Sequence, residues 1–100
     1  MVNAKDRAKF REELVGVIAA AGSSKLLLAK FLEDLFTPTE FDEVAARWQI
    51  VKLLKAEVPH HEIAKRTHTA VATVTRGSRE MKDPRGGFQA VLRILKQSNS

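Results

Sequence analysis

Apolar residues recur along the chain at the intervals of amphipathic helices. In the first part of the chain, one apolar stripe predicts a helix from about residue 3 to residue 21. Gly22 is expected to end this helix, and Ser24 to cap the next one. The stripe consists of Phe10, Leu14, Val17, Ile18 and Ala21.

The next helix, predicted over residues 25–36, carries apolar side chains on more than one side. A helix that is apolar nearly all round has to be buried nearly all round. A chain of 100 residues offers too little material to bury it alone. We therefore predict an obligate dimer with interleaved N-terminal helices. The apolar residues of this helix are Leu26, Leu27, Leu28, Phe31, Leu32, Leu35 and Phe36.

The segment Thr37-Pro38-Thr39-Glu40 marks the start of a third helix. Thr37 suits the N-cap, Pro38 suits the first helical position, and Glu40 completes a capping box. The helix is predicted to continue to about Glu57, with Trp48 in the core. Its apolar face consists of Phe41, Val44, Ala45, Trp48, Val51 and Leu54.

Residues 60–81 hold two short helical patterns that are separated by about three residues. Ile63, Ala64, Val71 and Val74 have the spacing by which two crossed helices close a small shared core. Outside this core, the second helix carries small, hydroxyl and arginine side chains, which suit base edges and phosphates. The pattern indicates a helix-turn-helix whose second helix enters the major groove of DNA.

A last helix is predicted after Pro84, with Asp83 as its N-cap. It is expected to pack on the rest of the chain, and residues 98–100 are expected to fray. Its apolar stripe consists of Phe88, Val91, Leu92 and Leu95.

The positive charge of the chain is concentrated in its C-terminal part. Residues 1–58 contain nine Lys or Arg and nine Asp or Glu, whereas residues 59–100 contain eight and three. The whole net charge of +5 therefore lies in the part that carries the two-helix motif. This distribution indicates that the basic part contacts a polyanion.

Composition argues against several classes of function. The absence of cysteine excludes a disulfide framework and cysteine-ligated zinc. The first residues lack the pattern of a signal peptide, and no apolar run can span a bilayer, so we expect a soluble cytoplasmic protein with no membrane partner. The segment from His61 to Lys65 fails the HExxH pattern at its last position, so we expect no metal site. No catalytic arrangement is suggested, and we expect no enzyme.

Two separated motifs resemble the bacterial tryptophan repressor family. One is Leu35-Phe36-Thr37-Pro38-Thr39-Glu40 followed by Val44-Ala45-Ala46-Arg47, and the other is Ala70-Val71-Ala72-Thr73-Val74-Thr75-Arg76-Gly77-Ser78. The resemblance covers about Phe31 to the C-terminus. It implies an all-α, six-helix fold with a helix-turn-helix and an intertwined homodimer. We expect one domain over residues 1–100, with a dimerisation core (1–58), a helix-turn-helix reading head (59–82) and a C-terminal packing helix (83–97).

The resemblance also implies a repressor that binds a palindromic operator in double-stranded DNA when L-tryptophan, its corepressor, is bound. In the family the indole ring lies between two arginines, which match Arg47 and Arg76, and a threonine of the other subunit matches Thr37. Gly77 would leave room beside the ring. Glu80 aligns with a family serine that receives the ligand's amino group, so a carboxylate there would pair with an ammonium or change the preferred ligand.

The DNA contacts that the resemblance implies fall on the two-helix motif. His60 and His61 lie on its first helix, and His61 aligns with a family arginine that reaches a guanine. The turn has His68 where the family usually has glycine, so a strained, left-handed residue is expected there. The side chains expected at the groove or at phosphates on the second helix are Val71, Ala72, Thr73, Thr75, Arg76, Arg79 and Lys82.

Two other functions stay compatible with the sequence. Asp34 aligns with a family leucine that lies beside the site. If Glu80 and Asp34 prevent tryptophan from binding, a ligand-independent helix-turn-helix regulator would bind DNA equally with and without tryptophan. A helical interaction module that does not bind DNA would show no salt-dependent affinity for it. Arg47 and Arg76 argue against the first alternative, and the basic part of the chain argues against the second.

Overall fold

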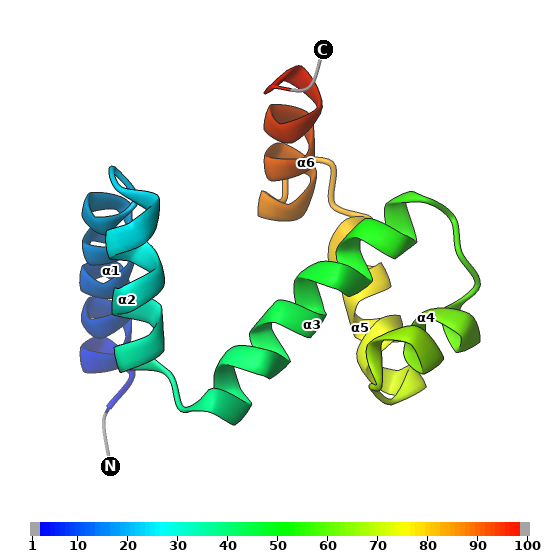
Figure 1. The fold of residues 1–100 in the computed structure, drawn as a ribbon, viewed down its shortest axis with the longest axis horizontal. Helices are drawn as coiled ribbons and strands as arrows, with labels where there is room; N and C mark the ends of the chain where they lie inside the picture. Colours follow the sequence, from blue (N-terminus) through cyan, green and yellow to red (C-terminus); the bar gives the residue numbers. More distant parts are fainter. Residues whose placement is uncertain (1–2, 99–100) are drawn as a thin grey trace. The chain divides into compact units, whose positions relative to one another are not determined.

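Six α-helices make up residues 3–98, the part of the chain that the structure, a computed structural model, describes (Figure 1). No β-strand occurs among these residues, which confirms the all-α prediction. The chain divides into two compact units, of which the first ends at Phe41 and the second begins at Asp42. The helices are α1 (Ala4–Ala21), α2 (Lys25–Leu35), α3 (Pro38–Lys55), α4 (His60–Thr67), α5 (Val71–Met81) and α6 (Gly87–Ser98).

Short polar side chains cap the first two helices, at Ser24 as predicted and at Asn3, where no cap was predicted. The side chain of Asn3 accepts a hydrogen bond of 2.9 Å from the Asp6 amide at the start of α1. Ser24 Oγ accepts one of 3.2 Å from the Leu27 amide at the start of α2. Each cap satisfies a backbone donor that the helix cannot bond itself, which fixes where the helix begins.

The start of α3 has the predicted capping box. The Thr37 amide donates to Glu40 Oε1 over 2.9 Å, and the Glu40 amide donates to Thr37 Oγ1 over 3.2 Å. The rings of Phe36 and Phe41 lie 6.0 Å apart between centroids, which adds a hydrophobic staple across the same turn. Helix α2 ends at Leu35, and Phe36 is its C-cap rather than its last residue.

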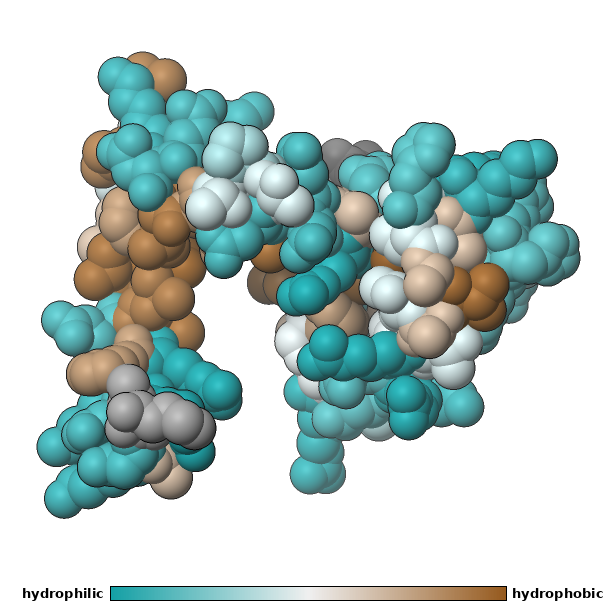
Figure 2. Space-filling view, turned by 90° about the horizontal axis from the view of Figure 1, so that it is seen from below, coloured by the Kyte–Doolittle hydropathy of each residue, from teal (hydrophilic) through white to brown (hydrophobic). Residues whose placement is uncertain are grey.

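The first unit pairs α1 with α2 but buries little apolar surface. Ala21 is the buried residue of this pair, whereas Phe10 and Leu26 are 58% and 67% exposed. Figure 2 shows brown, apolar side chains gathered on the open surface of this unit. One chain therefore leaves much of the predicted apolar surface of both helices uncovered.

The core of the second unit lies where α3, α4 and α5 meet. Ile50, Ile63, Ala64 and Val74 are buried together, with Leu53, Leu54 and Val58 packed against them. Three of the four residues that the sequence assigned to the core of the two-helix motif are therefore buried. The fourth assignment was wrong: Val71 is 49% exposed, because it lies on the first turn of α5, on the side away from this core.

The apolar face predicted for α3 is partly wrong. Ile50, which was not assigned to it, is 2% exposed and lies at the centre of the core. Val44 is 40% exposed and Trp48 is only half-buried, because α4 and α5 cover the side of α3 that carries Ile50. Helix α3 ends at Lys55, and Glu57 adopts a left-handed conformation with φ of 62° in the turn before α4.

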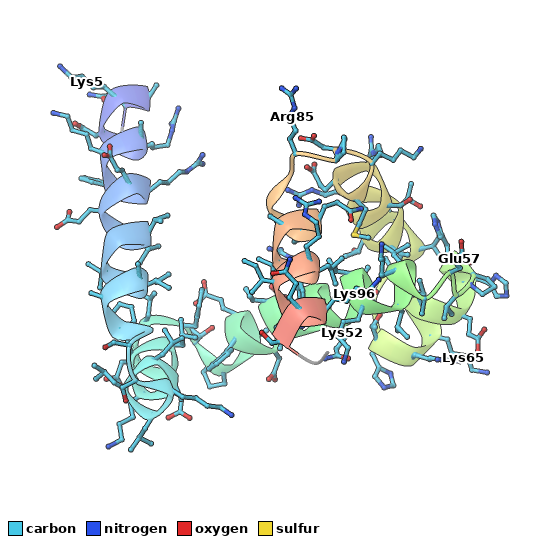
Figure 3. The ribbon with its side chains drawn as sticks, turned by 90° about the horizontal axis from the view of Figure 1, so that it is seen from above. Lys5, Lys52, Glu57, Lys65, Arg85 and Lys96 are labelled. Carbon is cyan, nitrogen blue, oxygen red and sulfur yellow. The ribbon has the colours of Figure 1, made fainter. Side chains whose placement is uncertain are left out.

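The last helix begins later than predicted. Asp83 does not cap α6, which begins at Gly87. Asp83 instead closes a turn, because its Oδ1 accepts from the Arg85 amide and its carbonyl accepts from the Gly86 amide. In this turn the Arg85 side chain points away from the helices of its unit (Figure 3).

Helix α6 contacts α5, as a packing helix should, but leaves part of its apolar stripe open. The side-chain amide of Gln89 donates to the Met81 carbonyl over 2.8 Å and ties the two helices together. Val91 and Leu95 stay 43% and 44% exposed. Ser98 ends α6, and the fraying expected at residues 99 and 100 lies outside the described residues. None of the described helices is long and apolar enough to cross a membrane.

Candidate functional site

A cavity of about 170 Å³ lies in the second unit between α3, α5 and α6. It brings together four of the five residues that were predicted to bind a ligand, namely Arg47, Arg76, Gly77 and Glu80. The fifth, Thr37, belongs to the first unit, where it caps α3. The complete lining is Arg47, Ile50, Val51, Thr73, Arg76, Gly77, Glu80 and Phe88.

The periodicity of α5 divides its surface into three faces, because residues three or four apart share a side of a helix. One face meets the core at Val74. A second face, with Thr73, Gly77 and Glu80, lines the cavity. The third face is exposed and carries most of the residues predicted to read DNA. This exposed face consists of Val71, Ala72, Thr75 and Arg79, and the exposed Lys82 follows as the C-cap of α5.

Two residues of α5 belong to the cavity although they were predicted to contact DNA. Thr73 is half-buried and lines the cavity, so it does not belong to the exposed face of α5. Arg76 lies at the border, since it lines the cavity and is also exposed. A single guanidinium at this border can reach a ligand in the cavity and a phosphate outside it.

Gly77 allows α5 to approach α3 closely. A Cβ atom at this position would lie 3.3 Å from Ile50 Cγ2 and 3.5 Å from Leu54 Cδ1. The first of these distances is tight for a packed carbon, so any larger residue would press on the core beneath the cavity. The resemblance implied that Gly77 leaves room beside the indole ring of the ligand. The close packing of α5 against α3 gives a second reason for glycine at this position.

The charged groups of the cavity do not neutralise one another. Within residues 3–98, no ion pair joins Arg47 or Arg76 to Glu80. The cavity therefore offers two guanidinium groups and one carboxylate beside apolar walls. A flat apolar molecule with charged substituents is the kind of ligand that such a surface suits.

Sequence reasoning missed part of the lining. Ile50, Val51 and Phe88 were assigned to packing or to no role, yet they form the apolar walls. The spacing of Thr73, Gly77 and Glu80 contained the signal for Thr73, since all three fall on one side of a helix. Phe88 had no such signal, because its place depends on how α6 folds back after the turn at Asp83.

The turn of the two-helix motif has the strained residue that was predicted. His68 adopts φ of 55° and ψ of 41°, a left-handed conformation that glycine would adopt at lower cost. Thr67 Oγ1 donates to the Ile63 carbonyl over 2.8 Å and lies 2.9 Å from Thr69 Oγ1. These hydroxyl contacts help to hold the turn.

The first helix of the motif presents polar and basic side chains to the outside. His60 and His61 are exposed, and Lys65 points outward from α4 (Figure 3). Arg66 forms an ion pair of 2.6 Å with Glu62 on the same helix. A shallow hollow on this surface is lined by His61, Glu62, Lys65, Arg66 and His68. Among the described residues, no group of His, Asp or Glu has the arrangement of a metal site.

The sequence profile of the Trp repressor protein family matches residues 11–96. The chain belongs to the Trp repressor family. The match begins well before Phe31, so the resemblance extends further toward the N-terminus than the two motifs indicated.

Several members of the Trp repressor family are similar in sequence, and each is named Trp operon repressor homolog. The protein of Actinobacillus succinogenes is 48% identical over 54 residues, which cover 53% of this chain and 54% of the relative. That of Pasteurella multocida is 46% identical over 62 residues, 61% of either chain. That of Chlamydia trachomatis serovar D is 39% identical over 64 residues, 59% of this chain and 68% of the relative. No solved structure matches the chain.

Proposed function

We propose that this chain is an L-tryptophan-dependent transcriptional repressor that binds a palindromic operator as a homodimer. The observation that carries the proposal is the cavity, in which Arg47 of α3 and Arg76 of α5 line one space with Gly77 between α5 and α3. Membership of the Trp repressor family supports the same function. The relatives' printed names, which refer to the trp operon, support it as well.

The proposed ligand site places the indole ring of tryptophan between the two guanidinium groups. Guanidinium groups are flat, stack on aromatic faces and still donate to a carboxylate. Ile50 and Phe88 supply apolar wall for the ring. Thr37 of the other subunit is proposed to help hold the ligand carboxylate, and Glu80 completes the site.

Tryptophan would act on DNA affinity by fixing the position of α5. The cavity is lined by α3, by α6 and by one face of α5. This face of α5 lies beside the exposed face that is proposed to read DNA. A ligand held there restricts the motion of α5, so less ordering remains to be done when DNA binds. In a two-fold dimer the two copies of α5 must lie about 34 Å apart to enter successive major grooves.

The exposed face of α5 is the proposed reading surface. Ala72 and Thr75 are small enough to approach base edges, whereas Arg79 and Lys82 suit phosphates. His60 and His61 would add contacts from α4. Residues 1–58 carry no net charge, and the whole excess of +5 lies in residues 59–100, the part of the chain that contains the reading surface.

The homodimer is proposed because the first unit cannot bury itself. Leu26, Leu27 and Phe10 are each more than half exposed in one chain. A two-helix unit with this much open apolar surface gains stability only when another surface covers it. Sedimentation should give a dimer at micromolar concentration, and a stable folded monomer there would contradict the proposal.

Replacing Arg76 by alanine tests the proposed site. We expect Arg76→Ala to weaken both tryptophan binding and operator binding, because Arg76 lies at the border between the cavity and the exposed face. The loss of a guanidinium contact to a charged or aromatic group corresponds to about a tenfold or larger fall in tryptophan affinity. Calorimetric titration with L-tryptophan measures the first effect, and a binding titration with operator DNA measures the second.

Arg79→Ala is the matched control, since it removes the same side chain from the same helix outside the cavity. It should keep the tryptophan affinity of the wild type and lose DNA affinity only. Unchanged tryptophan binding by Arg76→Ala would remove this arginine from the proposed pocket.

A further inference from the structure

We infer that the reading head takes up protons when it binds DNA, so that its affinity for DNA rises as the pH falls from about 8 to about 6. The groups that take up the protons are the imidazoles of His61 and His68. This inference rests on the proposed function, because it concerns the part of the chain that is proposed to contact DNA. It adds a control by pH to the proposed control by tryptophan.

The first step is that the two histidines share one surface. His61 lies on the first turn of α4, and His68 is the C-cap residue that follows this helix. Both side chains are exposed, and both line the shallow hollow on α4. A single anion in this hollow can therefore come close to two imidazoles.

The second step is where this hollow lies relative to DNA. In a helix-turn-helix, the first helix crosses the sugar–phosphate backbone, while the start of the second helix enters the major groove. The hollow lies on α4, which is the first helix of the motif. His68 lies in the turn that leads to Val71, the first residue of α5. Backbone phosphates are therefore the groups that the hollow would meet.

The third step is the charge that faces the histidines on α4. Lys65 and Arg66 are the positive groups of the hollow, and Glu62 is its carboxylate. Glu62 Oε1 lies 2.6 Å from Arg66 Nη2, so this carboxylate already has a partner. A phosphate that enters the hollow would meet Lys65 together with the two imidazoles.

His68 also faces charged groups of α3. There it lines a second hollow with Glu43 and Arg47, to which α5 contributes the uncharged Thr73. One carboxylate and one guanidinium leave this side without net charge. Carboxylate, lysine and arginine side chains ordinarily keep their charge between about pH 6 and pH 8, whereas imidazole changes its charge in this range. The histidines are therefore the groups through which pH can act on the reading head.

The direction of the effect follows from the charge of the phosphate. A negative group beside an imidazole favours the charged form of the imidazole, so the complex takes up protons as it forms. By linkage, a step that takes up protons becomes more favourable as the pH falls. In a two-fold dimer both reading heads contribute, which doubles the dependence of the binding free energy on pH.

Binding titrations at about pH 8 and about pH 6 test the inference. The probe is a palindromic duplex selected from random-sequence DNA, with L-tryptophan at a saturating concentration. The wild-type protein should bind the duplex at least about tenfold more tightly at the lower pH. Salt should also weaken binding more steeply there, because each protonated histidine on a phosphate adds about 0.9 to the slope of log affinity against log salt. A histidine that only supports the fold would leave this slope unchanged.

The double variant His61→Gln, His68→Asn removes both imidazoles. Asparagine tolerates the left-handed conformation of residue 68 better than most residues do. In this variant the affinities at the two pH values should agree within about twofold, and the two salt slopes should be the same. Circular dichroism at both pH values confirms that the six helices are retained.

Two control variants separate the imidazoles from other charges of the reading head. Lys65→Gln removes a fixed positive charge from the same hollow, so it should weaken DNA binding at both pH values and keep the wild-type ratio of affinities. His60 is exposed but does not line the hollow. His60→Gln should therefore keep most of the wild-type ratio.

The outcomes distinguish this inference from the proposed function. Equal affinity of the wild type at both pH values, or a wild-type ratio in the double variant, would overturn the role of the two histidines and leave the proposed repressor intact. If the wild type shows no salt-dependent binding to DNA at either pH, the proposed function falls and the inference falls with it.

Discussion

At the scale of single residues, the side chains of α5 carry most of the account. Neighbouring positions on this helix have different surroundings: Val74 is buried, Gly77 lies against α3, and Arg76 borders both the cavity and the outside. The resemblance to the Trp repressor family implied that Arg76 and Gly77 belong to a site with Arg47. The sequence could not predict Phe88 in the same lining, since no spacing in the sequence relates α6 to the cavity.

The capping box gives a prediction about pH. The hydrogen bond from the Thr37 amide, and a smaller contribution from the Thr37 side chain, lower the pKa of Glu40 below its ordinary value of 4.5. The ionised carboxylate therefore stabilises the folded state. This stabilisation is fully present above the pKa of the unfolded chain and is lost as the pH falls through the lower pKa of the folded state.

Urea unfolding of the wild type and of Glu40→Gln measures this effect. Glutamine keeps the capping geometry but not the charge. The wild type should be the more stable protein at neutral pH, and the difference should disappear as the pH falls well below 4.5. A difference that stays the same at all pH values would show that the charge of Glu40 has no part in the cap.

At the scale of elements, the sequence predicted where the helices start more accurately than it predicted how they pack. The caps at Ser24 and Thr37 were predicted and are present. The prediction for Asp83 was wrong because an Asp before a proline suits a turn as well as a helix start, and here its carboxylate closes the turn. The face of α3 was mispredicted at Ile50, since a helix with apolar residues on several sides does not indicate which side its neighbours cover.

The turn between α4 and α5 gives a prediction about stability. His68 has a left-handed conformation, which costs a residue with a Cβ atom more than it costs glycine. His68→Gly should therefore raise the free energy of unfolding by roughly 0.5–1 kcal/mol, after the larger entropy of glycine in the unfolded chain is included.

Lys65→Gly is the control for this turn, because it places glycine at an exposed helical position of α4. That change should lower stability by about 1 kcal/mol. Urea unfolding at one fixed protein concentration compares both variants with the wild type. If His68→Gly destabilises the protein as Lys65→Gly does, the turn is not strained at His68.

At the scale of the whole molecule, the two units differ in how far they are complete. The second unit has a buried core of its own around Ile50, Ile63 and Val74. The first unit leaves its apolar side chains open. From the apolar residues all round the second helix, which no single stripe could contain, we predicted that one chain cannot bury this helix. The predicted subdivision at residue 58 stays a prediction, and the two compact units divide the chain between residues 41 and 42, within the first turns of α3.

The central claim is that a ligand held by α3 and α5 controls contact with DNA. Its most direct test is a binding titration with a palindromic duplex, selected from random-sequence DNA in the presence of L-tryptophan, at two salt concentrations. We predict much tighter binding with tryptophan than without it, and an affinity that falls steeply as salt rises. Equal affinity with and without tryptophan would contradict the account in favour of a ligand-independent regulator, and the absence of salt-dependent binding would exclude DNA as the partner.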